Sequence, residues 1–340
     1  MGRTVWRITA SVTVAVVVFA SGDGVAGAST DDAGRAASAM AYVGAEQLAD
    51  GSFPGFSAVG STADTVLDMT ATGFGGAALT DALTYLRSQV HTGNVTGVGL
   101  TAKVLMAAEA ALAAGRTAVD PTHFGGADLI ASITGAERPS GRFRDASVFD
   151  QALAIIALVS AGATPTVAET TWLAGAQCPD GGWQFDRPHR ASENRHCRDK
   201  SDPNDSTSSD TNTTAMAVMA LHGLRAPDAD PFAFFHSIRD HVHHGWGYTW
   251  GFHRTDANST SLVLQAFAAD GKRPPARAAR ALRRLRYPCG AVAYSFDDDG
   301  RRTGKDVAAT IGAALGFLGE PFPVEPVALV APWATTCPPG

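Results

Sequence analysis

Long apolar runs are scarce in this 340-residue sequence. Past residue 28, Gly, Thr and charged residues interrupt each apolar stretch before it is long enough to cross a bilayer, so we expect no membrane span. Lysine is scarce too, and the many Arg and Ala residues indicate a GC-rich bacterial source. The net charge of −6 argues against nucleic acid or an anionic membrane as a partner.

Cysteine is also sparse, with four residues and no Cys-x-x-Cys spacing. An even number in an exported chain favours disulfides, and four cysteines allow three connectivities. We favour Cys178–Cys197, which closes a polar insert, and Cys289–Cys337, which ties the C-terminal tail to the last turn. The alternative is a metal site at Cys178, His196 and Cys197. Without a matching ligand spacing we predict no metal.

The first 28 residues have the three parts of a secretory signal. Arg3 and Arg7 form a basic start, residues 8–20 an apolar core too short to span a bilayer, and residues 26–28 an Ala-x-Ala cleavage site. We therefore expect a secreted, extracellular mature protein.

One pattern recurs along the chain and decides the predicted architecture. An Asp-x-x-x-Thr motif opens three apolar runs, at Asp210, Asp256 and Asp306, which are 46 and 50 residues apart. Weaker copies open near residues 64, 101 and 150, and most follow a Gly turn that bears an aromatic residue. Repeated units of this length predict six helical hairpins. We expect an all-α, closed (α/α)6 toroid over residues 29–320, followed by a Pro-rich tail over residues 321–340.

Two of the Gly turns carry a longer motif. Gln177-Cys-Pro-Asp-Gly181-Gly-Trp183 matches Gln-x-x-x-Gly-x-Trp, and Gln47, Gly51 and Phe53 repeat it with Phe for Trp. The motif resembles the QW repeat of squalene cyclases and protein prenyltransferases. The resemblance implies a secreted, single-domain member of the terpenoid cyclase/protein prenyltransferase toroid superfamily. The cobalamin-binding toroids of the intrinsic factor and transcobalamin group are also similar.

Unusual residues gather between the Gly turns and the inner helices. Inner helices of such a toroid run parallel, so their N-termini share one mouth. We predict that this mouth binds an apolar or amphipathic small molecule, such as an isoprenoid or a corrinoid, without a cofactor. The predicted ligand-binding residues are Trp246, Tyr248, Trp250, Phe252, His253 and Asp256.

An enzyme is the alternative, and the sequence leaves the choice open. One of Asp297, Asp298 and Asp299, kept protonated, would donate a proton to an alkene or epoxide, as squalene-type cyclases do. The cyclase motif is Asp-x-Asp-Asp, and Phe296 stands at its first position. A glycosidase or lyase using Asp256 and Asp297 is a further version, and an extracellular protein-binding scaffold is the third hypothesis. Ligand identity and oligomeric state are beyond the sequence.

Overall fold

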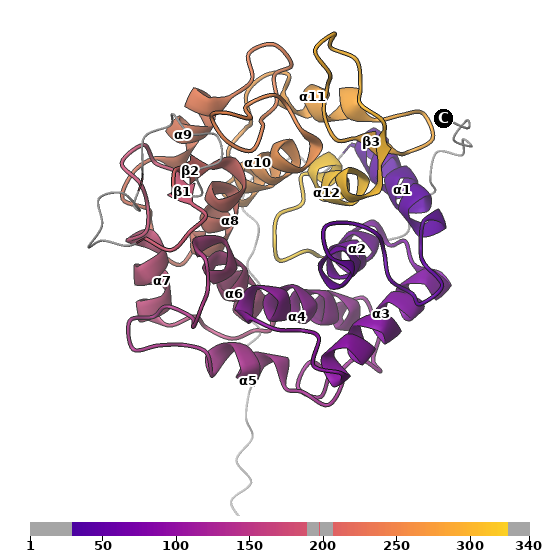
Figure 1. The fold of residues 1–340 in the computed structure, drawn as a ribbon, viewed down its shortest axis with the longest axis vertical. Coiled ribbons are helices and arrows are strands. Elements are labelled where there is room, and N and C mark those ends of the chain that lie inside the picture. Colours follow the sequence, from indigo (N-terminus) through magenta and orange to yellow (C-terminus); the bar gives the residue numbers. More distant parts are fainter. Residues whose placement is uncertain (1–28, 189–196, 198–206, 326–340) are drawn as a thin grey trace, which may run out of the picture.

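The structure is a computed structural model that describes residues 29–188, 197 and 207–325. Two rings of helices surround a common axis (Figure 1). The inner ring is α2 (Ala58–Thr72), α4 (Val98–Ala113), α6 (Val148–Ser160), α8 (Thr211–Leu221), α10 (Ala257–Ala269) and α12 (Val307–Leu318). The outer ring is α1 (Thr30–Ala45), α3 (Gly76–His91), α5 (Leu129–Thr134), α7 (Val167–Ala174), α9 (Pro231–Ile238) and α11 (Ala278–Leu285).

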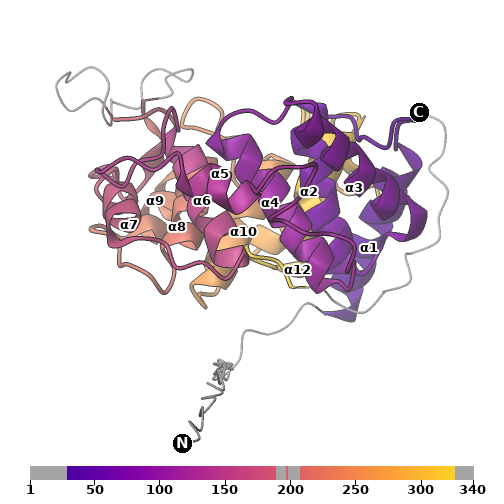
Figure 2. The ribbon, with the colours of Figure 1, turned by 90° about the horizontal axis from the view of Figure 1, so that it is seen from below.

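The inner ring is closed. Each inner helix contacts the next, and α12 returns to contact α2. In the edge-on view the two rings form one layer of helices around the axis (Figure 2). The predicted closed α/α toroid is therefore confirmed.

The pairing of helices within the ring differs from the predicted hairpins. We expected each outer helix to pair with the inner helix that follows it. Instead α2 packs more on α3 than on α1, α4 packs on α5, and α1 packs most extensively on α12. The first outer helix, α1, thus covers the outer side of the last inner helix, α12. Packing the two chain ends together is what closes the ring.

The two defining positions of the Asp-x-x-x-Thr motif, Asp and Thr, each accept one backbone hydrogen bond. Asp210 caps α8 by accepting a hydrogen bond from the backbone N–H of Thr213, which satisfies one of the free N–H groups of the first turn. Thr214, four residues on, accepts the backbone N–H of Trp183 at 2.9 Å. One motif therefore starts the inner helix and holds the preceding Gly turn against it.

Equivalent side chains hold the other turns. The backbone N–H of the turn residue is accepted at 2.9 to 3.0 Å in each case, and the acceptors are Thr62, Gln151, Thr260 and Thr310. We call these four residues and Thr214 the anchor residues. Because every anchor occupies the same place relative to its Gly turn, the anchors put five of the six inner helices in a common register.

The two copies of the longer repeat motif fold alike. Gln177 donates from Nε2 to the carbonyl oxygens of Gly181 and Ala229, and Gln47 makes the matching pair of bonds to Gly51 and Ala78. Each Gln thus ties its turn to the start of the next outer helix. Gly181 and Gly51 both have positive φ, 89° and 88°, and a Cβ there would meet backbone within 2.5 Å.

Aromatic side chains wedge between the repeats where the turns place them. Trp183 and Trp246 are fully buried, and their Nε1 atoms donate to the carbonyls of Leu173 and Phe235. Phe53 is buried in the same way. The last turn differs, because Tyr294, the aromatic residue that follows its glycine, is not buried in this way. Tyr294 is 43% exposed.

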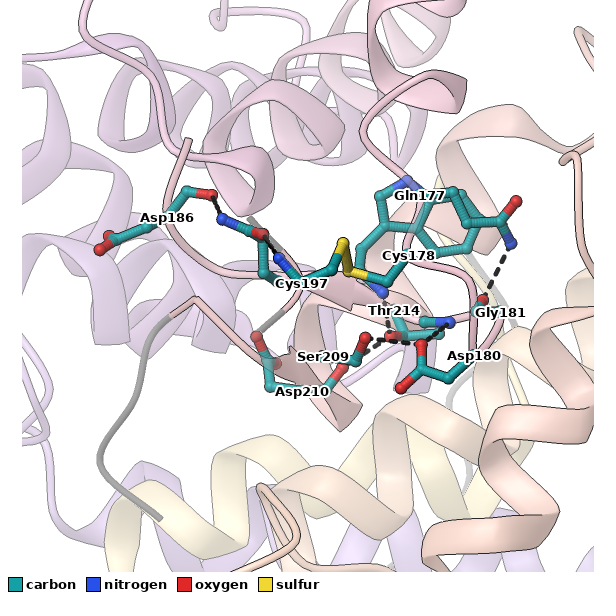
Figure 3. Close-up of a disulfide and its surroundings, with 12 residues drawn as sticks. Gln177, Cys178, Asp180, Gly181, Asp186, Cys197, Ser209, Asp210 and Thr214 are labelled. Atoms are coloured by element: carbon teal, nitrogen blue, oxygen red, sulfur yellow. Dashed lines mark hydrogen bonds between the residues drawn. A yellow bond between two sulfur atoms is a disulfide. The ribbon is translucent and has the colours of Figure 1, made fainter. Parts of the chain in front are cut away.

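The structure tests one of the two predicted disulfides and only the start of the predicted C-terminal tail. Cys178–Cys197 is a disulfide with a Cα–Cα distance of 5.4 Å, and it lies beside the Gln177 turn (Figure 3). Cys289 is disulfide-bonded too, but Cys337 lies outside the described residues, as do the predicted secretory signal and residues 326–340. The start of the predicted tail is packed, since Val324 is buried in the core.

None of the described helices has the length and apolarity needed to cross a membrane.

Candidate functional site: the central cavity

A cavity of about 240 Å³ occupies the axis of the toroid. All six inner helices contribute to its wall, and Phe322 from the C-terminal segment contributes as well. The larger part of the wall is apolar, with side chains that include Leu67, Met106, Leu153, Met216, Leu262 and Leu315. Pockets for drug-sized ligands occupy roughly 300–1,000 Å³. This cavity therefore suits a smaller or slimmer molecule.

The wall follows from the register that the anchors set. The residue two before an anchor is four residues from the one two after it and seven from the one five after it. All three positions therefore lie on one face of a helix. The five positions two after an anchor all line the cavity: Asp64, Leu153, Met216, Leu262 and Gly312. The sequence thus gives each inner helix one stripe that faces the axis.

An ion pair lies among the otherwise apolar residues that stand two positions after the anchors. Lys103 on α4 donates from Nζ to both carboxylate oxygens of Asp64 on α2, at 2.6 and 2.9 Å. Both side chains are partly exposed, 25% and 37%. The pair places a charged contact between α2 and α4 beside an apolar space.

Asp68 lies one helical turn deeper on α2 and is 3% exposed. Burial raises the pKa of Asp68 well above its usual value, the negative charge of Asp64 raises it further, and Lys103 lowers it. Its Oδ2 atom has no hydrogen-bond partner among the described residues. Asp68 is therefore a buried carboxyl group that favours its protonated form and faces a cavity.

Three amide side chains add polar atoms to the wall. Asn212 and Asn258 stand two residues before the anchors of α8 and α10, and Gln265 stands five residues after the anchor of α10. The side-chain oxygens of all three are buried and unpaired within the described part of the chain. Buried acceptors without partners carry a free-energy cost that a hydrogen-bond-donating ligand would remove.

The cavity opens toward the mouth where the inner helices begin. A second hollow of about 400 Å³ lies at the rim, and it shares Phe56, Asn258 and Ala308 with the central cavity. Phe56 is 90% exposed. The shared residues make the outer hollow a vestibule of the inner one, with the Phe56 ring at the passage between them.

The six predicted ligand-binding residues lie at the rim, outside the wall of the central cavity. Trp246 is the buried wedge described above, and Asp256 caps α10 while 3% exposed. The backbone carbonyl of Tyr248 accepts the first N–H of α8, and burial raises the pKa of its phenol. Phe252 and His253 are exposed, and Trp250 is half-buried. Their role in binding a ligand stays a prediction.

The predicted acid residues form a surface turn. Asp298 and Asp299 are exposed, and they pair with Arg254 at 2.6 Å and Arg301 at 3.2 Å. Asp297 accepts the backbone N–H of Arg301. The arrangement is that of a solvated turn with its own counter-charges. None of the three Asp residues lines the central cavity.

Sequence reasoning missed the residues that do line the cavity. Asp64 was noticed only as the start of a weak repeat, and Asp68, Lys103 and Gln265 were passed over. A signal was present, since Asp64 and Asp68 are four residues apart within a run that is otherwise apolar or hydroxyl-bearing. Two carboxylates on one face of a helix with no polar face indicate a site in its buried surface.

The metal site considered at Cys178, His196 and Cys197 is not formed by the two cysteines, because they are joined in a disulfide; His196 lies outside the described residues. The described residues contain no group of three or more His, Cys, Asp or Glu side chains that could hold a metal ion. At the rim, His243 has two other partners. Its Nδ1 lies 2.9 Å from Asp240, and its ring stacks on Phe296 at 4.4 Å.

No protein-family model matches the sequence, and no curated protein matches it either. Solved structures do resemble the fold. An inactive variant of the α-1,6-mannanase GH76A of Salegentibacter sp. HEL1_6, in complex with α-1,6-mannotriose, has a TM-score of 0.52 at 10% identity, over 85% of this chain and 98% of that one. The type II terpene cyclase MstE from Scytonema has a TM-score of 0.51 at 14% identity, over the same shares of the chains.

A variant of MstE in complex with geranylgeranyl dihydroxybenzoate gives a TM-score of 0.51 at 13% identity, over 85% of this chain and 97% of that one. Identities of this size show the fold alone. The fold that these structures share with this chain is an α/α toroid.

Proposed function

We propose that this protein is an enzyme that transfers a proton to a small, largely apolar substrate held in the central cavity, with Asp68 as the general acid. The observation that carries the proposal is the environment of Asp68. The group is buried in the wall of the cavity, its pKa is raised, and one of its oxygens has no partner in the described chain. A carboxyl kept neutral by an apolar site can donate a proton near neutral pH.

The chemistry needs no co-reactant. The O–H bond of Asp68 breaks, and its proton adds to one carbon of an alkene, whose π electrons form the new C–H bond and leave a carbocation. The rings of Phe149 and Phe322 line the cavity and would stabilise that cation through their faces. Loss of a proton from a neighbouring carbon back to the Asp68 carboxylate restores the acid. The net reaction is an isomerisation or cyclisation.

Asp64 and Lys103 have a separate role in this proposal. The negative charge of Asp64 helps to keep Asp68 protonated, and Lys103 holds the Asp64 carboxylate in place. Asp64 would also stabilise the cation electrostatically. Both are positioning residues rather than proton donors.

The apolar wall favours this chemistry over glycoside cleavage. The fold is shared with a mannanase and a type II terpene cyclase, so the fold leaves both classes open. A sugar would need hydrogen bonds on many sides, whereas most of this wall is aliphatic or aromatic. The chemistry of the site therefore supports the cyclase-like alternative.

A second candidate function is ligand binding without turnover, which was our first expectation from the sequence. The unpaired amide oxygens of Asn212, Asn258 and Gln265 support it, because an apolar wall with a few polar atoms suits an amphipathic molecule. In this version the binding site is the cavity rather than the aromatic rim. For either function we propose an extracellular location, supported by the Cys178–Cys197 disulfide.

Deuterium incorporation separates the two functions and tests the acid. The protein is incubated in D₂O with geraniol, farnesol and their epoxides, and the products are analysed by mass spectrometry. We expect wild-type protein to yield products that carry deuterium. Asp68→Asn should reduce the rate by about 10²–10⁴-fold, because the amide keeps the shape and cannot donate the proton.

Asp297→Asn is the matched control, since it removes a carboxylate from the surface turn and should leave the rate unchanged. Loss of turnover in Asp297→Asn with full activity in Asp68→Asn would move the acid to the rim. Binding of the same alcohols with no deuterium in any product would support the ligand-binding function instead.

A further inference from the structure

The polar atoms of the cavity are not scattered around its wall. Asn212 and Asn258 occupy equivalent positions on the neighbouring helices α8 and α10, two residues before their anchors. The Oδ1 atoms of both are buried and lack a partner in the described chain. Two matched amides with unpaired oxygens therefore lie in the wall of the cavity on adjacent helices, near the ends where the inner helices begin.

The fold makes room for one of these amides. A Cβ at Gly312 on α12 would lie 2.2 Å from Asn258 Oδ1. Any larger residue at Gly312 would displace the amide. Both residues line the cavity, so the absence of a side chain at Gly312 leaves room for the Asn258 amide in the cavity wall.

Below these amides one side of the cavity is apolar. Met216, Leu262 and Gly312 form the middle level on α8, α10 and α12. Asp68 lies at the deep end, six residues past the anchor Thr62. The mouth amides and Asp68 are thus eight positions apart in the common register. At 1.5 Å per residue this corresponds to about 12 Å measured along an inner helix.

We infer that the cavity takes a slender molecule about 12 Å long, whose hydrogen-bond-donating end, a hydroxyl or amine, binds Asn212 and Asn258 while its far end meets Asp68. The inference rests on the proposed function for the role of Asp68, and it adds the shape, polarity and orientation of the substrate. The cavity volume of about 240 Å³ fits a single chain of this length.

Two isomeric probes isolate the donor end. Decan-1-ol can donate a hydrogen bond from its hydroxyl group, and 1-methoxynonane, with the same atoms, cannot. Binding is measured by isothermal titration calorimetry. We expect wild-type protein to bind the alcohol about fivefold more tightly than the ether, the effect of one hydrogen bond to a buried acceptor.

Substitutions at the two ends test the orientation. Asn212→Leu with Asn258→Leu should abolish the preference for the alcohol, because Leu has the shape of Asn and no acceptor. Gln265→Met, which removes the deep amide, should keep the preference. The single variants Asn212→Leu and Asn258→Leu are measured in the same way. Thermal melting shows that each variant is folded.

Three results would overturn the inference: no preference in the wild type, a preference that survives in the double variant, or a preference lost in Gln265→Met alone. A saturated alcohol has no group for Asp68 to protonate, so these measurements do not depend on turnover. If Asp68→Asn keeps full activity while the alcohol preference follows the Asn pair, the proposed function fails and the orientation stands.

Discussion

The rim and the interior of the toroid both hold buried carboxyl groups, but their environments are opposite. At the rim, Asp240 accepts hydrogen bonds from the backbone of Val242, His243 and Thr255. Burial alone would raise the pKa of Asp240, but the hydrogen bonds from Thr255 and His243 lower it below its usual value. In the interior, burial raises the pKa of Asp68 without hydrogen bonds to offset it.

The difference teaches which polar groups are available for chemistry. A carboxylate that accepts several backbone N–H groups stays ionised and holds a loop in place. A carboxyl group that faces a cavity without such partners stays neutral and reactive. The rim is conspicuous in sequence because its residues are unusual, yet the fold uses many of them to build turns and caps.

The largest expected effect at the rim is structural. Trp246→Ala removes a fully buried ring and its hydrogen bond to Phe235, so we expect a loss of about 3–5 kcal/mol in the free energy of unfolding. Phe252→Ala, at an exposed rim position, should change it by less than about 0.5 kcal/mol. Urea denaturation measures both. A small loss in Trp246→Ala with loss of ligand binding would instead restore this residue to the site.

A smaller effect should appear in the pH dependence of stability. Burial raises the pKa of Asp256 to about 7, although hydrogen bonds from Ser259 oppose the rise. The unfolded chain has a carboxyl pKa of about 3.9, so the native state binds this proton more tightly. The stability that protonation gives is complete below about pH 4 and is lost as the pH rises through about 7.

Asp256→Asn removes this titration and keeps the helix cap, since Asn caps as well as Asp. We expect the variant to gain about 2–4 kcal/mol relative to wild type between pH 4 and pH 7, with no further change above that. Asp306, which caps α12 and is less buried, provides the control variant Asp306→Asn. A pH-independent difference for Asp256→Asn would show that Asp256 is ionised throughout in the native state.

The smallest effect belongs to the surface turn. Asp298 is exposed and pairs with Arg254, which is itself partly exposed. Exposed pairs contribute little to stability because water and salt screen them. Asp298→Asn should therefore leave the melting temperature and the deuterium incorporation unchanged. Loss of turnover in this variant would reopen the hypothesis of an acid at the rim.

Much of the fold could be predicted because its signals are local. Asp210 and Thr214 are four residues apart and make bonds within one helix start and one turn. Gly181 must be glycine because its φ is positive and a Cβ would strike backbone. Such requirements recur with each repeat, so the closed toroid was visible in the spacing. The pairing of α1 with α12 was less visible, because it joins residues at opposite ends of the chain.

The site could not be predicted in the same way. Asp68 becomes a candidate acid only when five other helices surround it with apolar side chains. Its separation from Asn258 along the axis depends on the register of α2 against α10, which the anchors fix through tertiary hydrogen bonds. Neither relation has a signature in a short stretch of sequence.

The sequence by itself determined the repeat, the caps and the glycine turns, since each depends on residues close in the chain or on a motif with one favourable backbone geometry. Only the tertiary structure decided which polar groups are left without partners. That outcome depends on desolvation and hydrogen bonding from every neighbouring helix at once, and these act on the folded ring rather than on any one segment.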